Sequence, residues 1–180
     1  MTMLPVGSRA PDFTLPDQGG NGFRLSEAVV HGPVLLILYP ADWGFICRNE
    51  IVEFRDRQPV FGAMGVRLVG YSTNMIVSHA VWSDALKLEF PLLSDPSGDV
   101  AAMYGVLDVA EESFNRGRTK RALFLVDQRL NILYNWLTED QWLEPDYDEV
   151  EAACRSALAG NAAGNMVAPP PEDAVPRAGR

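Results

Sequence analysis

The sequence predicts an α/β fold in which helices flank a central mixed β-sheet. Residues 33–40, PVLLILYP, form a continuous apolar run that is typical of a central strand covered on both faces. Strand-like and helix-like patterns alternate after this run, as they do in an α/β core. Near the C-terminus, the apolar segments at residues 121–127 and 132–136 are separated only by residues 128–131. This spacing predicts an antiparallel hairpin and therefore a mixed sheet.

The N-terminal segment APDFTLPDQGGNGFRLSEA, residues 10–28, predicts a β-hairpin and a short helix. Two short apolar segments flank the glycine-rich turn at residues 18–22. Ser26 follows the second segment, and its hydroxyl is suited to cap the first turn of a helix.

The segment after residue 45 predicts a long surface helix. Apolar residues recur there at roughly helical spacing among charged residues. Pro59 is expected to kink or interrupt this helix, because its ring nitrogen carries no N–H. The later patterns predict a strand at residues 66–72, a helix at 75–86, a strand at 90–94, and a turn with a short helix at 95–106.

The C-terminal region predicts one more helix and then a tail. The helix is expected to start at Pro145 and to end near Gly160, since proline suits the first turn of a helix and glycine the position just past its end. Residues 161–180 contain too few large apolar side chains to compensate for the entropy of ordering. The sequence therefore predicts one domain, residues 1–160, and a flexible tail, residues 161–180.

The composition indicates a soluble protein with a substantial core. The chain has 180 residues, 47% of them hydrophobic, and a formal net charge of −9. This charge argues against a nucleic acid or an anionic membrane as a partner, because both require clustered Lys and Arg. The longest apolar run, residues 34–39, is too short to cross a bilayer, and no signal peptide is apparent. We therefore expect a cytoplasmic location.

The cysteine pattern argues against a structural metal site or a disulfide framework. Cys47 and Cys154 are the two cysteines, and the two histidines, His31 and His79, lie far apart in the sequence. The chain contains no Cys-x-x-Cys motif and no Cys/His cluster. We expect neither a metal nor an organic cofactor.

The position of Cys47 favours thiol chemistry. Cys47 follows the predicted strand at residues 33–40 and falls in the first turn of the next helix, where free N–H groups and the helix dipole stabilise a thiolate. A lone cysteine can also pack in a core as a small hydrophobic residue. Because reactive groups in α/β sheets gather at the carboxyl ends of strands, this position favours the reactive interpretation.

Residues 39–50, YPADWGFICRNE, resemble the active-site signature of the peroxiredoxins, which are thiol peroxidases of thioredoxin-like fold. In that signature a proline, a threonine or serine, and the reactive cysteine follow one another, and Pro40 and Cys47 match. The resemblance covers residues 5–160. It includes VGSRAPDFTLPD at residues 6–17, FPLLSDPSGDVAAMYGV at 90–106 and KRALFLVD at 120–127, the last being similar to the strand that carries the active-site arginine of the family.

The resemblance implies a role for each matching residue. Cys47 would attack a peroxide as a thiolate and become a sulfenic acid. Arg121 would hold the peroxide and polarise its O–O bond through several N–H donors. Pro40 would shield the thiol from water. Glu50 would orient an arginine through a charge-assisted pair, although an ordinary solvated helix carboxylate remains an open alternative.

The resemblance also implies partners. Hydrogen peroxide or organic hydroperoxides would be the substrates, a thioredoxin-like protein or a low-molecular-weight thiol would be the reductant, and the protein would be a homodimer. Cys154 falls at helical spacing from Val150 and Ala157, so we expect it to pack in the core rather than to act as a resolving cysteine. The enzyme would then be of the one-cysteine kind. His79 and Trp82 are expected to be packing or surface residues.

Gly44 departs from the signature, which has threonine or serine at this position. Glycine has no hydroxyl to seat a peroxide, although it allows a backbone N–H or a water to approach, and it also tolerates a positive φ. Loss of one preorganised donor lowers a rate by a factor on the order of 10²–10³. The sequence therefore predicts a weakened peroxidase or, as the alternative, a redox sensor or binding protein with little or no turnover. A thiol–disulfide oxidoreductase is disfavoured, because no second thiol is close to Cys47 in the sequence.

Overall fold

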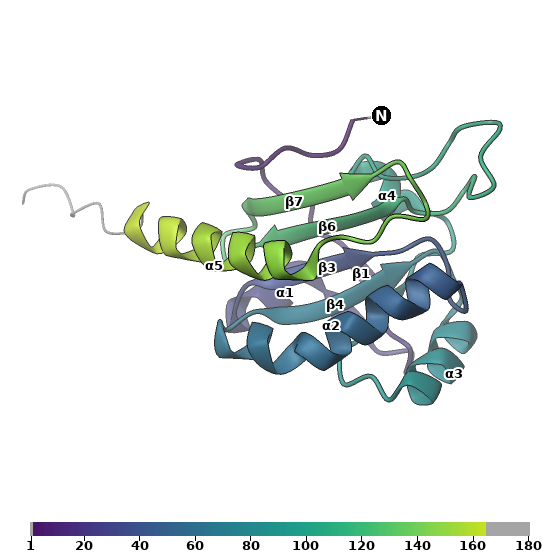
Figure 1. The fold of residues 1–180 in the computed structure, drawn as a ribbon, viewed down its shortest axis with the longest axis horizontal. Coiled ribbons are helices and arrows are strands. Elements are labelled where there is room, and N and C mark those ends of the chain that lie inside the picture. The colour runs from purple at the N-terminus through teal and green to yellow at the C-terminus, as the bar shows by residue number, and fades with distance from the viewer. Residues whose placement is uncertain (1, 165–180) are drawn as a thin grey trace, which may run out of the picture.

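A five-stranded mixed sheet lies at the centre of the protein, and the computed structural model describes residues 2–164 (Figure 1). In spatial order the strands are β5 (Leu92–Ser94), β4 (Arg67–Ser72), β3 (Val34–Leu38), β6 (Arg121–Val126) and β7 (Ile132–Thr138). The pairs β3/β4 and β4/β5 are parallel, whereas β6 is antiparallel to both β3 and β7. The first residue of β6 therefore lies near the carboxyl end of β3.

Two long helices, α2 (Phe45–Ala63) and α5 (Tyr147–Gly164), lie over the same face of the sheet (Figure 1). A separate antiparallel pair of strands near the N-terminus completes the β-structure. The remaining elements are β1 (Thr14–Pro16), β2 (Gly22–Arg24), α1 (Leu25–Ala28), the short 3₁₀ helix η1 (Val29–His31), α3 (Ile76–Leu86) and α4 (Asp99–Met103).

The central strand β3 is buried on both faces, as its apolar sequence predicts. Successive side chains of a strand point to opposite faces, so β3 contributes to two cores. Leu35 and Ile37 belong to the core that also contains Phe54 of α2 and Val150 of α5. Leu36 belongs to the core on the other face. Burial on both sides fixes the end of β3, from which the loop to Cys47 departs.

The predicted fold class is confirmed. Strands and helices alternate through the first part of the chain, the N-terminal segment forms a hairpin, and β6 and β7 form the predicted antiparallel hairpin. No helix within residues 2–164 is both long and apolar enough to span a bilayer.

Two local predictions are wrong. Ser26 does not cap α1, because Asp12 has that role: Asp12 accepts hydrogen bonds from the Ser26 backbone N–H at 2.9 Å and from the Ser26 hydroxyl at 2.8 Å. Pro59 does not interrupt α2, which continues through it. Phe54 and Phe61, on either side of Pro59, are fully buried and hold the helix against the sheet.

Asp146 sets the start of the last helix. The sequence predicts a start at Pro145, whereas α5 begins at Tyr147. The Asp146 carboxylate accepts hydrogen bonds from the N–H groups of Asp148 at 3.0 Å and Glu149 at 3.1 Å. Asp146 is therefore the N-terminal cap that the sequence analysis overlooked.

The last helix also continues beyond Gly160, where its end was predicted, and reaches Gly164. The side chain of Asn161 donates a hydrogen bond to Asp127 at 3.2 Å and so ties the final turn to the sheet. The predicted tail therefore starts too early. Its remaining part, residues 165–180, lies outside the described residues.

Candidate active site

Cys47 lies in the first turn of α2, directly after the loop that leaves β3. Gly44 is the residue that precedes the helix, and its carbonyl accepts the first helical hydrogen bond from the Arg48 N–H at 2.8 Å. The Cys47 side chain is buried, with 5% of the residue exposed, and its thiol is free. The predicted placement of this thiol at a strand-to-helix junction is confirmed.

Arg121 reaches the sulfur from the neighbouring strand. It is the first residue of β6, and Ala122 beside it pairs with Leu38 at the end of β3. The Arg121 Nη2 lies 3.6 Å from Cys47 Sγ and also donates to the Gln141 carbonyl at 3.3 Å. The guanidinium is almost completely buried. The structure thus brings together the thiol and the arginine that the sequence predicted.

Glu50 is the third member of this cluster. It lies one helical turn after Cys47 on α2, is fully buried, and forms an ion pair with the Nη1 of Arg121. The alternative of a solvated carboxylate is therefore wrong. Within residues 2–164, Glu50 Oε1 and Arg121 Nε are buried without a hydrogen-bond partner. Burial raises the pKa of Glu50 to about 7, against the opposing effect of the Arg121 charge.

The electrostatic balance at Cys47 differs from the prediction of a stabilised thiolate. Burial raises the pKa of the Cys47 thiol and outweighs the lowering effects of the Arg121 charge and of a hydrogen bond from the Ala41 backbone N–H. The negative charge of Glu50 contributes to the rise. A thiolate at Cys47 therefore depends on Arg121 and on the loop that presents Ala41.

A cavity of about 360 Å³ opens beside this cluster. Pro40 and Arg121 both line it, together with side chains that follow β7 and others from the loop before β6. Phe114 and Trp142, at its rim, are 84% and 70% exposed. Because Arg121 lines the cavity and also donates to Cys47 Sγ, a molecule in the cavity can reach the guanidinium next to the sulfur. Pro40 is buried and lines the cavity, and its role as a shielding residue stays a prediction.

Gly44 approaches the sulfur closely. A Cβ at this position would lie 3.3 Å from Cys47 Sγ and 3.5 Å from the Ala41 carbonyl oxygen. The φ angle of Gly44 is −65°, a value that any residue adopts. A positive φ is therefore not the reason for glycine at position 44. The feature that distinguishes this position is its close approach to the Cys47 sulfur.

Cys154 packs in the core, as predicted. It is completely buried on α5, and its thiol is free. Burial raises the pKa of Cys154 to about 12, with a smaller effect from the charge of Glu151. A thiol in this state is a poor nucleophile at neutral pH.

The sequence analysis missed a buried polar cluster beneath the loop. His79 of α3 was predicted to be a packing or surface residue, yet it is fully buried and contacts the Asp42 carboxylate. The one available signal was an aspartate inside the signature segment, YPADWGFICRNE, together with a single histidine on the helix after the next strand. Within residues 2–164, no group of three or more His, Cys, Asp or Glu side chains could hold a metal ion.

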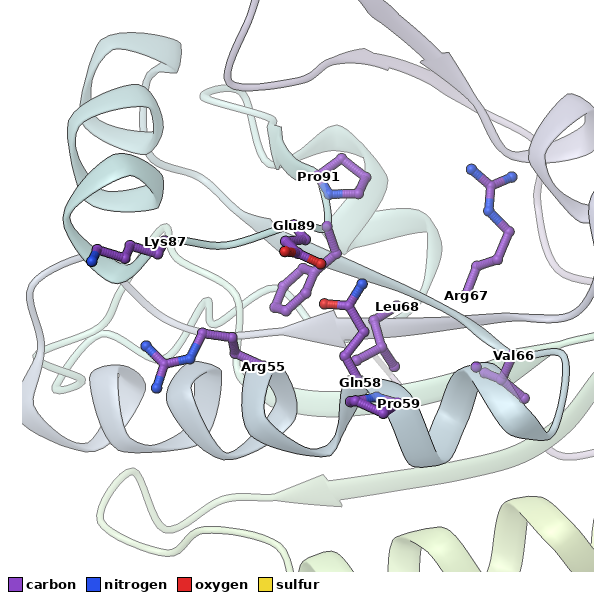
Figure 2. Close-up of a pocket in the computed structure, with 11 residues that line it drawn as sticks. Arg55, Gln58, Pro59, Val66, Arg67, Leu68, Lys87, Glu89 and Pro91 are labelled. Atoms are coloured by element: carbon purple, nitrogen blue, oxygen red, sulfur yellow. The ribbon is translucent and has the colours of Figure 1, made fainter.

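A separate cavity of about 800 Å³ lies between α2 and the segment that joins α3 to β5 (Figure 2). Figure 2 shows Arg55 and Lys87 on one side of this cavity and Arg67 on the other, with Glu89 between them. Arg55 donates to the Leu86 carbonyl at 2.8 Å and so is already engaged by the protein. None of the predicted site residues lines this cavity.

Comparison with known proteins decides the family. A family model described as AhpC/TSA family matches residues 6–135. The chain belongs to the AhpC/TSA family. The matched segment contains Pro40, Cys47, Glu50 and Arg121.

Several relatives support this family assignment. A Mycobacterium tuberculosis protein whose name places it among the peroxiredoxins is 31% identical over 163 residues, which cover 87% of this chain and 100% of the relative. The chloroplastic 2-cysteine peroxiredoxin of Chattonella marina var. antiqua is 34% identical over 135 residues, 69% of this chain and 66% of the relative. The protein is accordingly a peroxiredoxin, an oxidoreductase of the thiol peroxidase class.

Solved structures agree with the fold. The crystal structure of peroxidoxin BcpB from Mycobacterium tuberculosis has a TM-score of 0.72 and 32% identity, over 88% of this chain and 96% of the other. The crystal structure of Enterococcus faecalis AhpC has a TM-score of 0.77 and 23% identity, over 91% of this chain and 98% of the other. At this identity the similarity bears on the fold alone. The predicted thioredoxin-like fold is confirmed.

Proposed function

We propose that this AhpC/TSA protein reduces hydrogen peroxide or organic hydroperoxides through a sulfenic acid on Cys47. The thiolate sulfur attacks one peroxide oxygen, an S–O bond forms while the O–O bond breaks, and hydroxide or alkoxide leaves and takes up a proton. The observation that carries the proposal is the contact of 3.6 Å between Arg121 Nη2 and Cys47 Sγ in a site that opens to a cavity.

Arg121 has two tasks in this mechanism. Its positive charge lowers the pKa of Cys47, and its N–H groups can donate to the peroxide oxygens as negative charge develops on the leaving oxygen. The pair with Glu50 orients the guanidinium toward the sulfur, since Glu50 binds Nη1 and leaves Nη2 for Cys47. Pro40 keeps bulk water from the thiolate.

Gly44 weakens this reaction in our proposal. Where the signature has a hydroxyl, Gly44 has no side chain, so the peroxide loses one hydrogen bond beside the sulfur. The redox sensor is the second candidate, because the raised pKa of Cys47 also favours slow oxidation. The two candidates differ in whether a thiol reductant sustains turnover.

The reductant is an external thiol in our proposal. Cys154, the second cysteine of the chain, is buried in the core and has a raised pKa, so it does not serve as the resolving thiol. A thiol from solution would attack the sulfenic sulfur with loss of water, and a second thiol would release Cys47 from the mixed disulfide. A thioredoxin-like protein or a low-molecular-weight thiol fits this role.

We also propose that the protein is a homodimer. Trp43 and Phe45 near the start of α2 are exposed, as are Met75, Val77 and Val81 at and along α3. Trp43 lies against α3, because its Nε1 donates to Ser78 at 3.3 Å. Sedimentation velocity tests the proposal: a dimer for the parent and a monomer for Val81→Glu are expected, and a monomeric parent would contradict it.

The proposed activity is tested by peroxide consumption with dithiothreitol as the reductant. The parent is expected to consume hydrogen peroxide or cumene hydroperoxide over many turnovers, and Cys47→Ser to consume none above the background. A parent that consumes only one equivalent of peroxide per chain would support the redox sensor. A Cys47→Ser protein as active as the parent would remove Cys47 from the mechanism.

A further inference from the structure

We propose that the buried, hydrogen-bonded pair of Asp42 and His79 positions the loop of residues 40–44 against the Cys47 sulfur. Asp42 lies within the signature segment, but the sequence assigned no role in the reaction to it or to His79, and each bonds other partners than the sulfur. They are positioning residues, and their effect passes through the loop backbone. The inference rests on Cys47 being the thiol that reacts with peroxide.

The two ring nitrogens of His79 link Asp42 to the strand β5. Its Nδ1 lies 3.0 Å from Asp42 Oδ1, and its Nε2 lies 3.1 Å from the carbonyl oxygen of Leu93. A carbonyl oxygen only accepts hydrogen bonds, so Nε2 carries a hydrogen. The Ser72 hydroxyl lies 3.4 Å from Nε2 and donates its hydrogen to Asn74. Its oxygen can therefore only accept from Nε2.

Three side chains hold the carboxyl group of Asp42. It accepts hydrogen bonds from the Tyr39 hydroxyl at 2.9 Å and from the Ser78 hydroxyl at 2.7 Å, in addition to its contact with His79. These three contacts hold the Asp42 side chain in one place. The side chains of Asp42 and His79 have no exposed surface. The pair is therefore shielded from solvent, and its polar atoms depend on protein partners.

The loop that carries Asp42 lies next to the sulfur at two residues, Ala41 and Gly44. Ala41, the preceding residue, hydrogen-bonds Cys47 through its backbone N–H. Gly44 lies two residues after Asp42, and a Cβ on Gly44 would lie 3.3 Å from Cys47 Sγ. Asp42 is the only residue of this loop whose side chain is held by a buried network, and its backbone N–H also donates to Asn74 at 3.1 Å. A shift of Asp42 is therefore expected to shift Ala41 and Gly44, its neighbours next to the sulfur.

The loop conformation needs this anchor. Trp43 has a φ of 65°, in the left-handed region that is uncommon for residues with a large side chain. Its ring is exposed, and its Nε1 bonds the same Ser78 hydroxyl that donates to Asp42. A strained residue persists only when its surroundings hold it, and here the hydrogen bonds of Asp42 to His79 and Ser78 do so.

The test compares Asp42→Asn with a matched control, Asp127→Asn. Asp127 is an equally buried, hydrogen-bonded aspartate at the opposite end of β6 from Arg121. In Asp42→Asn, the Cys47 oxidation rate with hydrogen peroxide is expected to fall on the order of tenfold to a hundredfold. The pKa of Cys47 is expected to rise, because the Ala41 N–H no longer holds its place. In Asp127→Asn, the oxidation rate should stay within about twofold of the parent rate, and the pKa of Cys47 within about a few tenths of a unit of the parent value.

Hydrogen exchange separates positioning from general loss of stability. In Asp42→Asn, the amides of residues 41–47 should exchange faster while the strands β3 and β6 stay protected. A milder variant, Ser78→Ala, removes one donor to Asp42 and the partner of Trp43, and is expected to slow oxidation severalfold without unfolding the protein.

The outcomes discriminate between the two proposals. Parent-like oxidation of Cys47 in both Asp42→Asn and Ser78→Ala would overturn the positioning role, as would equal losses in Asp42→Asn and Asp127→Asn. If the parent itself does not react with peroxide, the proposed function fails. The exchange of residues 41–47 then still decides whether the Asp42–His79 pair holds the loop.

Discussion

The strongest single perturbation of the site is Arg121→Lys, which keeps the positive charge and removes the guanidinium fork. Arg121 uses Nη1 for Glu50 and Nη2 for Cys47, with Nη2 also held by the Gln141 carbonyl. The lysine ammonium is a single point and does not reproduce two directed contacts to opposite partners. The buried carboxylate of Glu50 competes for it, so the contact with the sulfur is expected to be lost.

The size of the effect follows from that lost contact. A hydrogen bond to a charged group contributes about 1.5–3 kcal/mol. Each 1.36 kcal/mol corresponds to a factor of ten in rate, so oxidation of Cys47 is expected to slow by about tenfold to a hundredfold. The fold should persist, because the charge opposite Glu50 remains.

The assay is rapid mixing of reduced protein with hydrogen peroxide, quenching at intervals with a sulfenic-acid trap, and mass measurement of the adduct. Arg118→Lys is the matched control, since Arg118 is exposed on the loop before β6. Melting temperatures of both variants confirm folding. A folded Arg121→Lys protein that is oxidised as fast as the parent would refute the reasoning and remove Arg121 from the site.

Four further predictions concern Gly44, Glu50 and Cys154. Gly44→Thr is expected to accelerate Cys47 oxidation by about tenfold to a hundredfold through a new hydroxyl. Gly44→Ala adds the same Cβ 3.3 Å from Cys47 Sγ and should not accelerate it. Equal rates in the two variants would show that the hydroxyl is not what the site lacks. Glu50→Gln is expected to lower the pKa of Cys47, measured by the ultraviolet absorbance of the thiolate, because Glu50 raises it; an unchanged pKa would contradict this electrostatic account. In the parent, the pKa of Glu50 is about 7 in the fold against an ordinary value of 4.5, so the folded state binds this proton more tightly than the unfolded chain does. The free energy of unfolding should therefore fall as the pH rises through this window, and chemical denaturation of Glu50→Gln should lack that fall. Cys154→Ser should leave the first oxidation rate unchanged, and a disulfide between Cys47 and Cys154 in oxidised parent protein, detected by mass spectrometry, would make this a two-cysteine enzyme.

The sequence predicted the architecture well because the relevant signals are local. The apolar run of β3, the helical spacing in α2 and the short turn between β6 and β7 each specify one element. Helix boundaries were less accurate where a cap came from elsewhere in the chain, as with Asp12, or where a tertiary contact extended the helix, as with Asn161. These contacts are not visible in local patterns.

The site was predictable only in part. The positions of Cys47 and Arg121 followed from the signature and from the antiparallel pairing of β3 with β6. The complete burial of Glu50 and the Asp42–His79 pair depend on how α2 and α3 pack on the sheet, which sequence spacing does not specify. The direction of the Cys47 pKa was also missed, because burial opposes the effects of the helix terminus and Arg121.

The central claim is that Cys47 is the thiol that peroxide oxidises, and its most direct test is a mapped adduct. Reduced protein is treated with one equivalent of hydrogen peroxide in the presence of a sulfenic-acid trap, digested, and analysed by mass spectrometry. The account predicts a single adduct on Cys47 and an unmodified Cys154. An adduct on Cys154 with Cys47 unmodified would contradict it.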